Sequence, residues 1–392
     1  MVRNYTLEGD SPYYSAAREL KKRHPNVEVV LEGLPYDEQR TKVLMTVAAG
    51  KGPCVAQVDC IWLGEFAEGG ILIDLTPYYE KWEDKNDIPE VFLESSKYNG
   101  KYYGVWLNSD VRLLQWEKEP LRKAGFDPEV PPKYWEEMAQ MVQKAQNPPE
   151  LWGFLYIAQA NDDTNDYWYP WLWQGGGRIL SEDYTKAMFN SEAGVQALQF
   201  WVDLMHKYKV TPQDVMSEAE DPSAALAQGL FVMGETVGLN WSRERFPTAE
   251  DLKKAVGARH LPIPPGGRQA TGSGGWLLGI TRDCKYPDLA WEFITLVTSP
   301  ENAKDFWKRE GMVPVRKSAI KDVAEYEEAF PYYHLVEEAV AFTHFRPYIP
   351  EYPKFAPALW TAIQKALLLE ATPKEALDEA AEETNKILAG EK

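Results

Sequence analysis

Histidine and serine side chains, which carry much of enzyme catalysis, form no recognisable catalytic pattern in this sequence. The five histidines are scattered, and none belongs to the His-Glu-x-x-His pattern that binds zinc on a helix. No Gly-x-Ser-x-Gly nucleophile elbow occurs. The glycine runs at 175–177 and 271–275 lack the Lys-Ser/Thr of a phosphate-binding loop, so we interpret both as turns.

The carboxylates leave open whether the chain is a glycoside hydrolase, and the thiols leave open whether two cysteines form a disulfide. The chain has 60 Asp and Glu residues, and a glycoside hydrolase needs only two carboxylates, so that enzyme class survives without a supporting motif. The three cysteines, Cys54, Cys60 and Cys284, are too few and odd in number for a disulfide scaffold. Pairing of Cys54 with Cys60 is one alternative, and we favour three buried thiols. No pair has the spacing of a zinc knuckle, so we expect neither metal nor cofactor.

Aromatic residues are the unusual part of the composition, with 15 Trp, 21 Tyr and 14 Phe. A core does not require so many indoles, because each ring is large and its N–H needs a partner. We therefore expect some of the tryptophans to line a binding surface.

Length and charge narrow the class of protein. A chain of 392 residues exceeds one ordinary core, so two domains are expected. The formal charge of -18 repels phosphate backbones and argues against nucleic-acid binding. No run of about 18 uncharged apolar residues is present to span a membrane. The first residues, Met1 to Tyr5, lack an apolar signal core, so either the protein is cytoplasmic or a signal segment has been removed.

The elements that must position these residues alternate between strand and helix over the first part of the chain. Val27, Val29 and Leu31 alternate as in a strand, and Asp37 stands where a helix would open. The predicted elements are strands at 3–8, 27–31 and 55–58, and helices at 13–24 and 37–50. Strands separated by helices predict crossover connections and a largely parallel sheet.

The middle of the chain is predicted to be helix-rich. Apolar faces of helical period occur at 135–145 and 195–205, and a tryptophan-dense stretch at 167–177 lies between them. Residues 261–275 are rich in Pro and Gly, which indicates a loop or linker. Near the end, Thr372, Pro373 and Glu375 form the start signal of a last helix, with a capping box.

A series of stretches resembles the family 1 extracellular solute-binding proteins, the maltose-binding-protein relatives of ABC importers. Each stretch alone is weak, but their shared order over nearly the whole chain makes the resemblance specific. The stretches are EGD at 8–10, the run from AAGKGPCVAQVD to ILIDL at 48–75, GVWLNSDVRLLQWEKEPLRKAGFDPEVPPKYWEEM at 104–138, FNSEAGVQALQFWVDL at 189–204, GLFVMGETVG at 229–238, LPIPPGG at 261–267, GSGGWLLGI at 272–280, AWEFITLVTSPEN at 290–302, GMVPVRKS at 311–318 and TPKEALDEAAEETNKIL at 372–388.

The resemblance implies an α/β, two-lobe periplasmic-binding-protein fold of type II, with a ligand cleft between the lobes and three hinge crossings. Lobe one would hold residues 1–109 and 262–316, and lobe two 110–261 and 317–392. The resemblance also implies hinge closure on a ligand, delivery to the membrane permease subunits of an ABC importer, and a monomer. It favours the removed signal segment, and with it a periplasmic or cell-surface location.

Two positions depart from the family pattern. Cys54 stands where relatives usually have aspartate, and Trp106 and Leu107 replace a pair that commonly contains proline. Neither changes the expected fold. Both leave the ligand less defined, because residues near 108–112 approach the cleft in relatives.

A sugar is the ligand we expect. Its C–H faces suit aromatic platforms, and its hydroxyls suit carboxylates, amides and guanidinium groups. Trp241 and Trp276 are favoured platforms because they follow Gly or Asn in predicted loops, and core packing is the alternative for every tryptophan. The candidate platforms are Trp62, Trp168, Trp171, Trp173, Trp241 and Trp276. The other candidate ligand-binding residues are Glu8, Asp10, Tyr36, Asp37, Asp59, Asn108, Asp110, Arg112, Glu235, Asn240, Ser273, Gly275 and Arg316.

Several of these residues have alternatives. Asp37 is equally suited to cap its helix, and Asp110 and Arg112 to form a hinge salt bridge. Asp10 has independent support, because it lies at the first strand–helix turn, where open α/β sheets bind ligands.

Two other functions remain alternatives. The first is the same fold binding a non-sugar, such as a polyol or polyamine, or an acidic sugar or sugar phosphate. Two arginines converging on the site would favour a uronate or a phosphate; the candidates are Arg112, Arg178, Arg268, Arg316 and Arg346. The second is a carbohydrate-active enzyme, which turnover of a glycoside would reveal. We expect a binding protein without catalytic residues.

Overall fold

The computed structural model describes residues 1–3, 7, 11–216, 225–226, 228–237, 245–310, 312–321, 326–328 and 331–391. The chain divides into two compact units, and both are built from separate segments of sequence. Unit 1 comprises Met1–Asp110, Gly274–Asp322 and Tyr348–Tyr352, and unit 2 comprises Val111–Ser273, Val323–Pro347 and Pro353–Lys392. The chain thus returns to unit 1 for five residues near its end. The predicted hinge positions at 109, 261 and 316 stay a prediction.

The main sheet of unit 1 has four strands in the order β13-β6-β12-β3. Every neighbouring pair in it is antiparallel. The prediction of a largely parallel sheet is therefore wrong for this sheet, because a strand from far along the chain separates the two early strands. The four strands are β3 (Val55–Asp59), β6 (Val105–Ser109), β12 (Gly275–Ile280) and β13 (Val313–Pro314).

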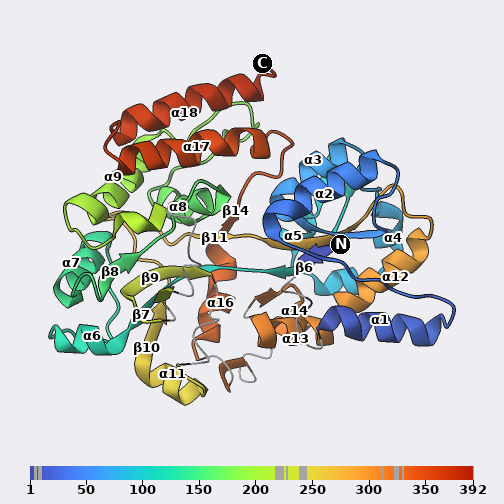
Figure 1. Ribbon diagram of the computed structural model, residues 1–392, viewed down its shortest axis with the longest axis horizontal. Helices are drawn as coiled ribbons and strands as arrows, with labels where there is room; N and C mark the ends of the chain where they lie inside the picture. Colours follow the sequence, from blue (N-terminus) through green and yellow to red (C-terminus); the bar gives the residue numbers. More distant parts are fainter. Residues whose placement is uncertain are drawn as a thin grey trace. The chain divides into compact units, whose positions relative to one another are not determined.

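Helices and short strands complete unit 1. The predicted strand at 27–31 is wrong: these described residues form no strand, and β2 (Gly33–Leu34) instead pairs in parallel with β1 (Val2–Arg3). The other elements are α1 (Pro12–Arg23), α2 (Tyr36–Ala48), η2 (Cys60–Trp62), α3 (Leu63–Glu68), α4 (Thr76–Lys81), η3 (Glu83–Asp87), α5 (Glu90–Ser95), β4 (Lys97–Tyr98), β5 (Lys101–Tyr102), α12 (Pro287–Val297), α13 (Pro300–Glu310) and α14 (Lys317–Ile320). Figure 1 shows α1 running beside α12, which it contacts.

The main sheet of unit 2 has the order β10-β7-β9-β8. Its neighbours are antiparallel except β8 and β9, which are parallel. The strands are β7 (Arg112–Glu117), β8 (Trp152–Leu155), β9 (Phe231–Val237) and β10 (Val256–Arg259). A smaller parallel pair joins β11 (Thr271–Ser273) to β14 (Thr343–Phe345), so the predicted linker at 261–275 contains a strand and the start of β12.

Helices of unit 2 follow the predicted apolar faces. The expected helix at 135–145 is confirmed as α7, and the face at 195–205 lies within α9. The tryptophan-dense stretch is helical as far as Gln174, because α8 continues through Pro170. The remaining elements are α6 (Lys118–Lys123), α7 (Trp135–Ala145), α8 (Asp162–Gln174), α9 (Glu192–His206), η4 (Gln213–Met216), α11 (Ala249–Ala255), α16 (Tyr333–Ala339), η5 (Val340–Phe342), α17 (Tyr352–Leu367) and α18 (Pro373–Leu388).

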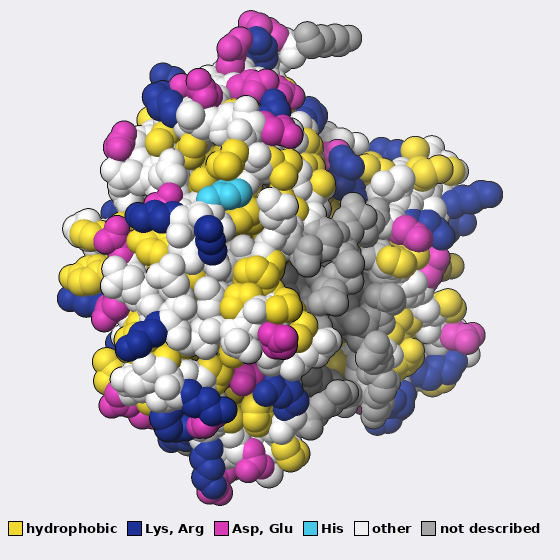
Figure 2. Space-filling view, turned by 60° about the vertical axis from the view of Figure 1, so that its left-hand side comes forward, with side chains coloured by type: hydrophobic (Ala, Val, Ile, Leu, Met, Phe, Trp, Pro, Cys, Tyr) yellow, Lys and Arg dark blue, Asp and Glu magenta, His cyan; other side chains and the backbone are white. Residues whose placement is uncertain are grey.

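The last helix, α18, confirms the predicted start signal. The Thr372 hydroxyl accepts from the Glu375 N–H, and the Glu375 carboxylate accepts from the Thr372 N–H. The helix packs on α9 and lies beside α17, to which Lys365 and Glu379 join it at 2.9 Å (Figure 1). Acidic side chains with interspersed lysines gather on its outer face at the top of Figure 2, which is the pattern of a solvated helix.

A disulfide corrects the expectation of three thiols. Cys54, the residue before β3, is bonded to Cys284, which lies 230 residues away in the segment after β12. Cys60 is buried and lies outside this disulfide, so it does not pair with Cys54. The short spacing made Cys60 the partner considered for Cys54. However, β12 runs antiparallel to β3, so the end of β12 lies beside the start of β3 and the segment after it brings Cys284 to Cys54.

Candidate functional site

An aromatic cluster forms on unit 1 where β3 ends. The ring of Tyr36 stacks on Trp62 at 5.5 Å and 21°. Trp276 meets both rings edge-on at 5.9 Å. Trp276 lies within β12, so the expected loop setting is wrong, and its neighbours across the sheet are Asp59 and Asn108. Three of the predicted site residues therefore share one cluster.

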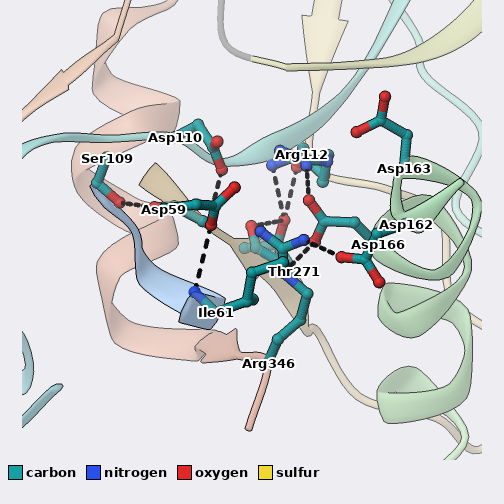
Figure 3. Close-up of polar contacts among 12 residues, drawn as sticks. Asp59, Ile61, Ser109, Asp110, Arg112, Asp162, Asp163, Asp166, Thr271 and Arg346 are labelled. Carbon is teal, nitrogen blue, oxygen red and sulfur yellow. Dashed lines mark hydrogen bonds and ion pairs between the residues drawn. The ribbon is translucent and has the colours of Figure 1, made fainter. Parts of the chain in front are cut away.

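Polar groups adjoin this aromatic cluster. The Asp59 carboxylate accepts from the Tyr36 hydroxyl at 3.0 Å and from the Ile61 N–H at 3.3 Å (Figure 3). The second contact caps the short helix η2, which fixes Trp62. Asn108 is 1% exposed, and within the described residues neither its amide oxygen nor its amide nitrogen has a hydrogen-bond partner. A buried amide with four unused hydrogen-bonding positions is costly unless a ligand or water meets it.

The end of β6 is tied to the start of β12. The Gly274 N–H donates to Asp110 Oδ1 at 2.8 Å, and the Ser109 hydroxyl donates to the Gly274 carbonyl at 2.9 Å. Gly275 has a φ of +128°, and a Cβ there would lie 2.8 Å from the Cα of Ser109. Close strand packing thus explains the glycine, while its predicted contact with ligand stays a prediction.

The candidate tryptophans of α8 are all buried in unit 2. Trp171 packs between Trp135, Phe154 and Phe200, which favours the core alternative. Trp173 stacks on His344 of β14 at 5.1 Å, and burial lowers the pKa of that imidazole. The Trp168 indole N–H is buried and has no hydrogen-bond partner among the described residues.

Glu235 of β9 is a fully buried acid. Its Oε2 accepts from the Trp171 indole N–H at 2.8 Å. Its Oε1 has no hydrogen-bond partner within the described part of the chain. Burial raises the pKa of Glu235 to about 8, and the Trp171 hydrogen bond and the Arg112 charge only partly oppose this shift. At neutral pH the group is therefore a carboxylic acid.

A second polar cluster in unit 2 joins β7, the first turns of α8 and the residue after β14 (Figure 3). The Arg112 guanidinium donates to Asp166. Arg346 donates to Asp162, and its Nε lies 3.6 Å from Asp166 Oδ1. The Thr271 hydroxyl holds the backbone of Arg112, accepting from its N–H at 3.1 Å and donating to its carbonyl at 2.8 Å. Two of the five arginines considered for an acidic ligand thus converge.

Arg316 lies elsewhere, inside unit 1. Its guanidinium donates to the backbone carbonyls of Thr298 at 2.8 Å and Asp84 at 3.1 Å, and it lies 4.8 Å above the Trp82 ring. These contacts favour a structural role over the predicted ligand role. Ser273 is buried at the end of β11.

Some predicted residues fall outside the described part of the chain: Glu8, Asp10, Asn240 and Trp241. The backbone of Asp37 is inside α2, but its side chain is not described. It is not the N-cap, which is Pro35.

Asp162, Asp166 and Thr271 are not among the residues that the sequence predicted for a site. Asp162 and Asp166 are four residues apart, so they face the same side of α8, and both follow the N-cap Asn161. This spacing in NDDTND was an available signal.

Among the described residues, none of the helices has both the length and the apolar character to cross a membrane. The same residues contain no group of three or more His, Cys, Asp or Glu arranged to hold a metal ion.

Residues 15–331 match the family model of the bacterial extracellular solute-binding proteins. The chain belongs to this family. Among curated relatives of this solute-binding family, a putative binding protein of Brucella abortus is 25% identical and aligns with 96% of this chain and 90% of its own length. The arabinooligosaccharide-binding protein of Bacillus subtilis is also 25% identical, over 78% of this chain and 70% of its own.

Solved structures show the same fold. A solute-binding protein of an ABC transporter from Thermotoga lettingae, bound with α-D-tagatose, has a TM-score of 0.88 and 27% identity, covering 99% of this chain and 98% of its own. Maltose-bound MalE3 of T. maritima has a TM-score of 0.85 and 26% identity, covering 98% and 99%. The chain therefore has the type II solute-binding fold that the sequence predicted. The similar proteins named here are binding proteins and not enzymes.

Proposed function

We propose that this protein binds a mono- or oligosaccharide and delivers it to the permease subunits of an ABC importer. The observation that carries the proposal is the cluster of Tyr36, Trp62 and Trp276 beside Asp59 and the unsatisfied amide of Asn108. Aromatic edges and faces suit the C–H surface of a sugar ring. The carboxylate and the amide suit its hydroxyls, as acceptor and as donor–acceptor pair.

The named relatives support a sugar as the ligand class. Proteins similar to this chain over nearly its whole length are bound with tagatose and with maltose. Both ligands are uncharged and carry several hydroxyl groups. We therefore place this chain with sugar-binding members of the family, and leave the ring size and the number of units to experiment.

Capture would use closure of two lobes, with the chain divided as 1–109 with 262–316 and 110–261 with 317–392. Ligand-driven closure would reduce the radius of gyration measured by small-angle scattering in the presence of the bound sugar. A radius that does not change on proven binding would contradict the closure mechanism.

The protein would act outside the cytoplasm, as a monomer that is either free in the periplasm or anchored at the cell surface. Support comes from the bond between Cys54 and Cys284, because structural disulfides form and persist in oxidising compartments. Native mass measurement of the purified chain tests the monomer. Thiol trapping in intact cells tests the compartment, since a cytoplasmic protein would hold both cysteines reduced.

The bound sugar would leave unchanged, because the protein would perform no hydrolysis. A thermal-shift screen against neutral sugars, polyols and acid sugars identifies the ligand, since a compound that binds only the folded state raises the melting temperature. Product analysis after long incubation with the best compound tests catalysis. A screen in which no sugar stabilises the protein would refute the sugar function.

A further inference from the structure

Residues 27–31 in unit 1 have the side-chain alternation of a strand, although within the described part of the chain no strand pairs with them. Val27, Val29 and Leu31 are half-buried, whereas the side chains between them are exposed, that of Val30 by 84%. Among the described residues, the backbone groups of the four residues after Val27 have no hydrogen-bond partner. The segment therefore offers a free strand edge, which natural proteins usually cover or pair.

A cavity of about 260 Å³ is lined both by this free edge and by residues 53–55 at the start of β3. Apolar side chains from two adjacent helices line it as well: Leu20 of α1 and Ala290 and Phe293 of α12 are buried there. Tyr286, whose side chain is 66% exposed, also borders it. A water molecule occupies about 30 Å³, so a cavity of this size and apolar character suits side chains better than water.

Strand β1 leads directly into this cavity. On one side of it, the Val2 N–H donates to the Glu32 carbonyl at 3.0 Å. On the other side, the Gln57 N–H donates to the Met1 carbonyl at 2.9 Å, and the Met1 amine donates to the Val55 carbonyl at 2.9 Å. Strand β1 therefore lies between β2 and β3, and Met1, at its start, lines the cavity.

The register of β1 predicts what a continuation of this strand would meet. Val2 pairs with Gly33, so the position before Met1 would lie opposite Leu31, and the position two residues further back would lie opposite Val29. Alternate residues of a strand face the same side, so both positions share the face of Val2, which is 3% exposed and lines the cavity. An extended segment with apolar residues at these two positions would fill the cavity and pair with both edges.

The amine of Met1 favours an occupant that is joined to it. Burial lowers the pKa of this amine to about 6, and the Glu32 charge only partly opposes the shift. A charged amine is therefore costly at the point where it meets the Val55 carbonyl. A peptide N–H would donate the same hydrogen bond and would have no charge to desolvate.

We propose that this cavity is a strand-binding site for an extended segment joined to Met1 through a peptide bond, with apolar residues at alternate positions. The segment would continue β1 as a strand between residues 27–31 and the start of β3. Main-chain hydrogen bonds on both sides would hold it, and the apolar cavity would select its side chains. A segment bound in this way would be fixed to unit 1. The proposal goes beyond the sugar-binding function and does not depend on it.

The test adds four residues before Met1. One variant carries Thr-Val-Thr-Val, which places its valines at the two positions that face the cavity. The matched control carries Val-Thr-Val-Thr, which has the same composition but the opposite alternation, so its threonines face the cavity. The first variant should melt about 3 °C or more above the parent protein, because buried valine side chains stabilise the folded state. The control should raise the melting temperature less.

Hydrogen exchange gives a second readout. In the first variant, the N–H groups of Val30 and Glu32 should exchange about tenfold more slowly than in the parent, because carbonyls of the added strand would accept from them. Equal melting temperatures and equal exchange in the two variants would overturn the proposal. Protection of these N–H groups by a separate Thr-Val-Thr-Val peptide, without protection by the joined segment, would also overturn it, because the occupant would then be another chain. Neither readout uses a sugar, so failure of this proposal is distinct from failure of the sugar function.

Discussion

The indole N–H of Trp171 donates a 2.8 Å hydrogen bond to Oε2 of Glu235, and both side chains are fully buried in unit 2. The carboxyl group is protonated in the folded protein up to a pKa of about 8, while an unfolded chain releases this proton near its ordinary value of 4.5. The folded state thus binds one more proton between these values. The contribution of Glu235 to the stability of the folded state therefore falls as the pH rises from about 4.5 to about 8.

Replacement of Glu235 by Gln should remove this pH dependence. Through this group, the free energy of unfolding of the parent falls by about 1.4 kcal/mol per pH unit. The free energy of unfolding of the variant should therefore rise relative to that of the parent by several kcal/mol between about pH 5 and pH 8. Denaturant melts at both pH values measure the difference. The control is Glu182→Gln, at a side chain that is 82% exposed. Its free energy of unfolding should differ from that of the parent by the same amount at both pH values. Parallel profiles for Glu235→Gln and the parent would contradict the assignment.

Asn108→Leu should separate stability from binding. Its amide has no partner within the described residues, so an apolar side chain of similar size should stabilise the fold by about 1 kcal/mol while sugar affinity falls about tenfold or more. Asn165→Leu provides the contrast, because that buried amide donates to the Ala356 carbonyl at 3.0 Å and its loss should destabilise. If Asn108→Leu bound sugar normally, the amide would not be a ligand contact.

Trp276→Ala should weaken sugar binding by more than tenfold, as loss of an aromatic platform typically costs about 2 kcal/mol or more. Trp106→Ala, on the adjacent strand β6, should instead reduce stability by roughly 3–5 kcal/mol, because its indole is buried and donates to Ser95. Melts run beside calorimetric titration distinguish the two effects. Equal losses of stability, with normal binding in the folded fraction, would place Trp276 in the core.

Cys54→Ser and Cys284→Ser should each lower stability by about 2–5 kcal/mol through loss of the disulfide. Cys60→Ser, which alters a thiol outside the bond, should cost less. Without reductant, the unfolded parent should react with a thiol reagent at Cys60 alone, and after reduction at all three cysteines. Three reactive thiols before reduction would show that the bond does not form.

Local signals predicted the helices best. The start of α18 followed from Thr372 and Glu375, because a capping box uses only residues within one turn. The face of α7 followed from spacing alone. These elements depend on neighbours in sequence, so the sequence is sufficient to find them.

Features that depend on contacts between distant segments were harder to predict from the sequence. The insertion of β12 between β3 and β6 made the unit 1 sheet antiparallel and brought Cys284 to Cys54. The contact of Asp166 with Arg346 joins residues that no local pattern connects. The family resemblance predicted the fold in spite of this. The chemistry expected of a sugar site put Tyr36, Trp62 and Trp276 among the candidates without indicating that they touch.

The strand order β13-β6-β12-β3 also constrains when unit 1 can assemble during synthesis. Strands β3 and β6 are made within the first 110 residues, yet their shared neighbour begins at Gly275. The hydrogen bond from Ser109 to Gly274 spans 165 residues, and pairings of such long range form slowly. Until they form, the nascent chain carries two strands whose edges lack these partners and can associate with other chains. Strands made early in the chain thus wait for late segments before their edges are protected from aggregation.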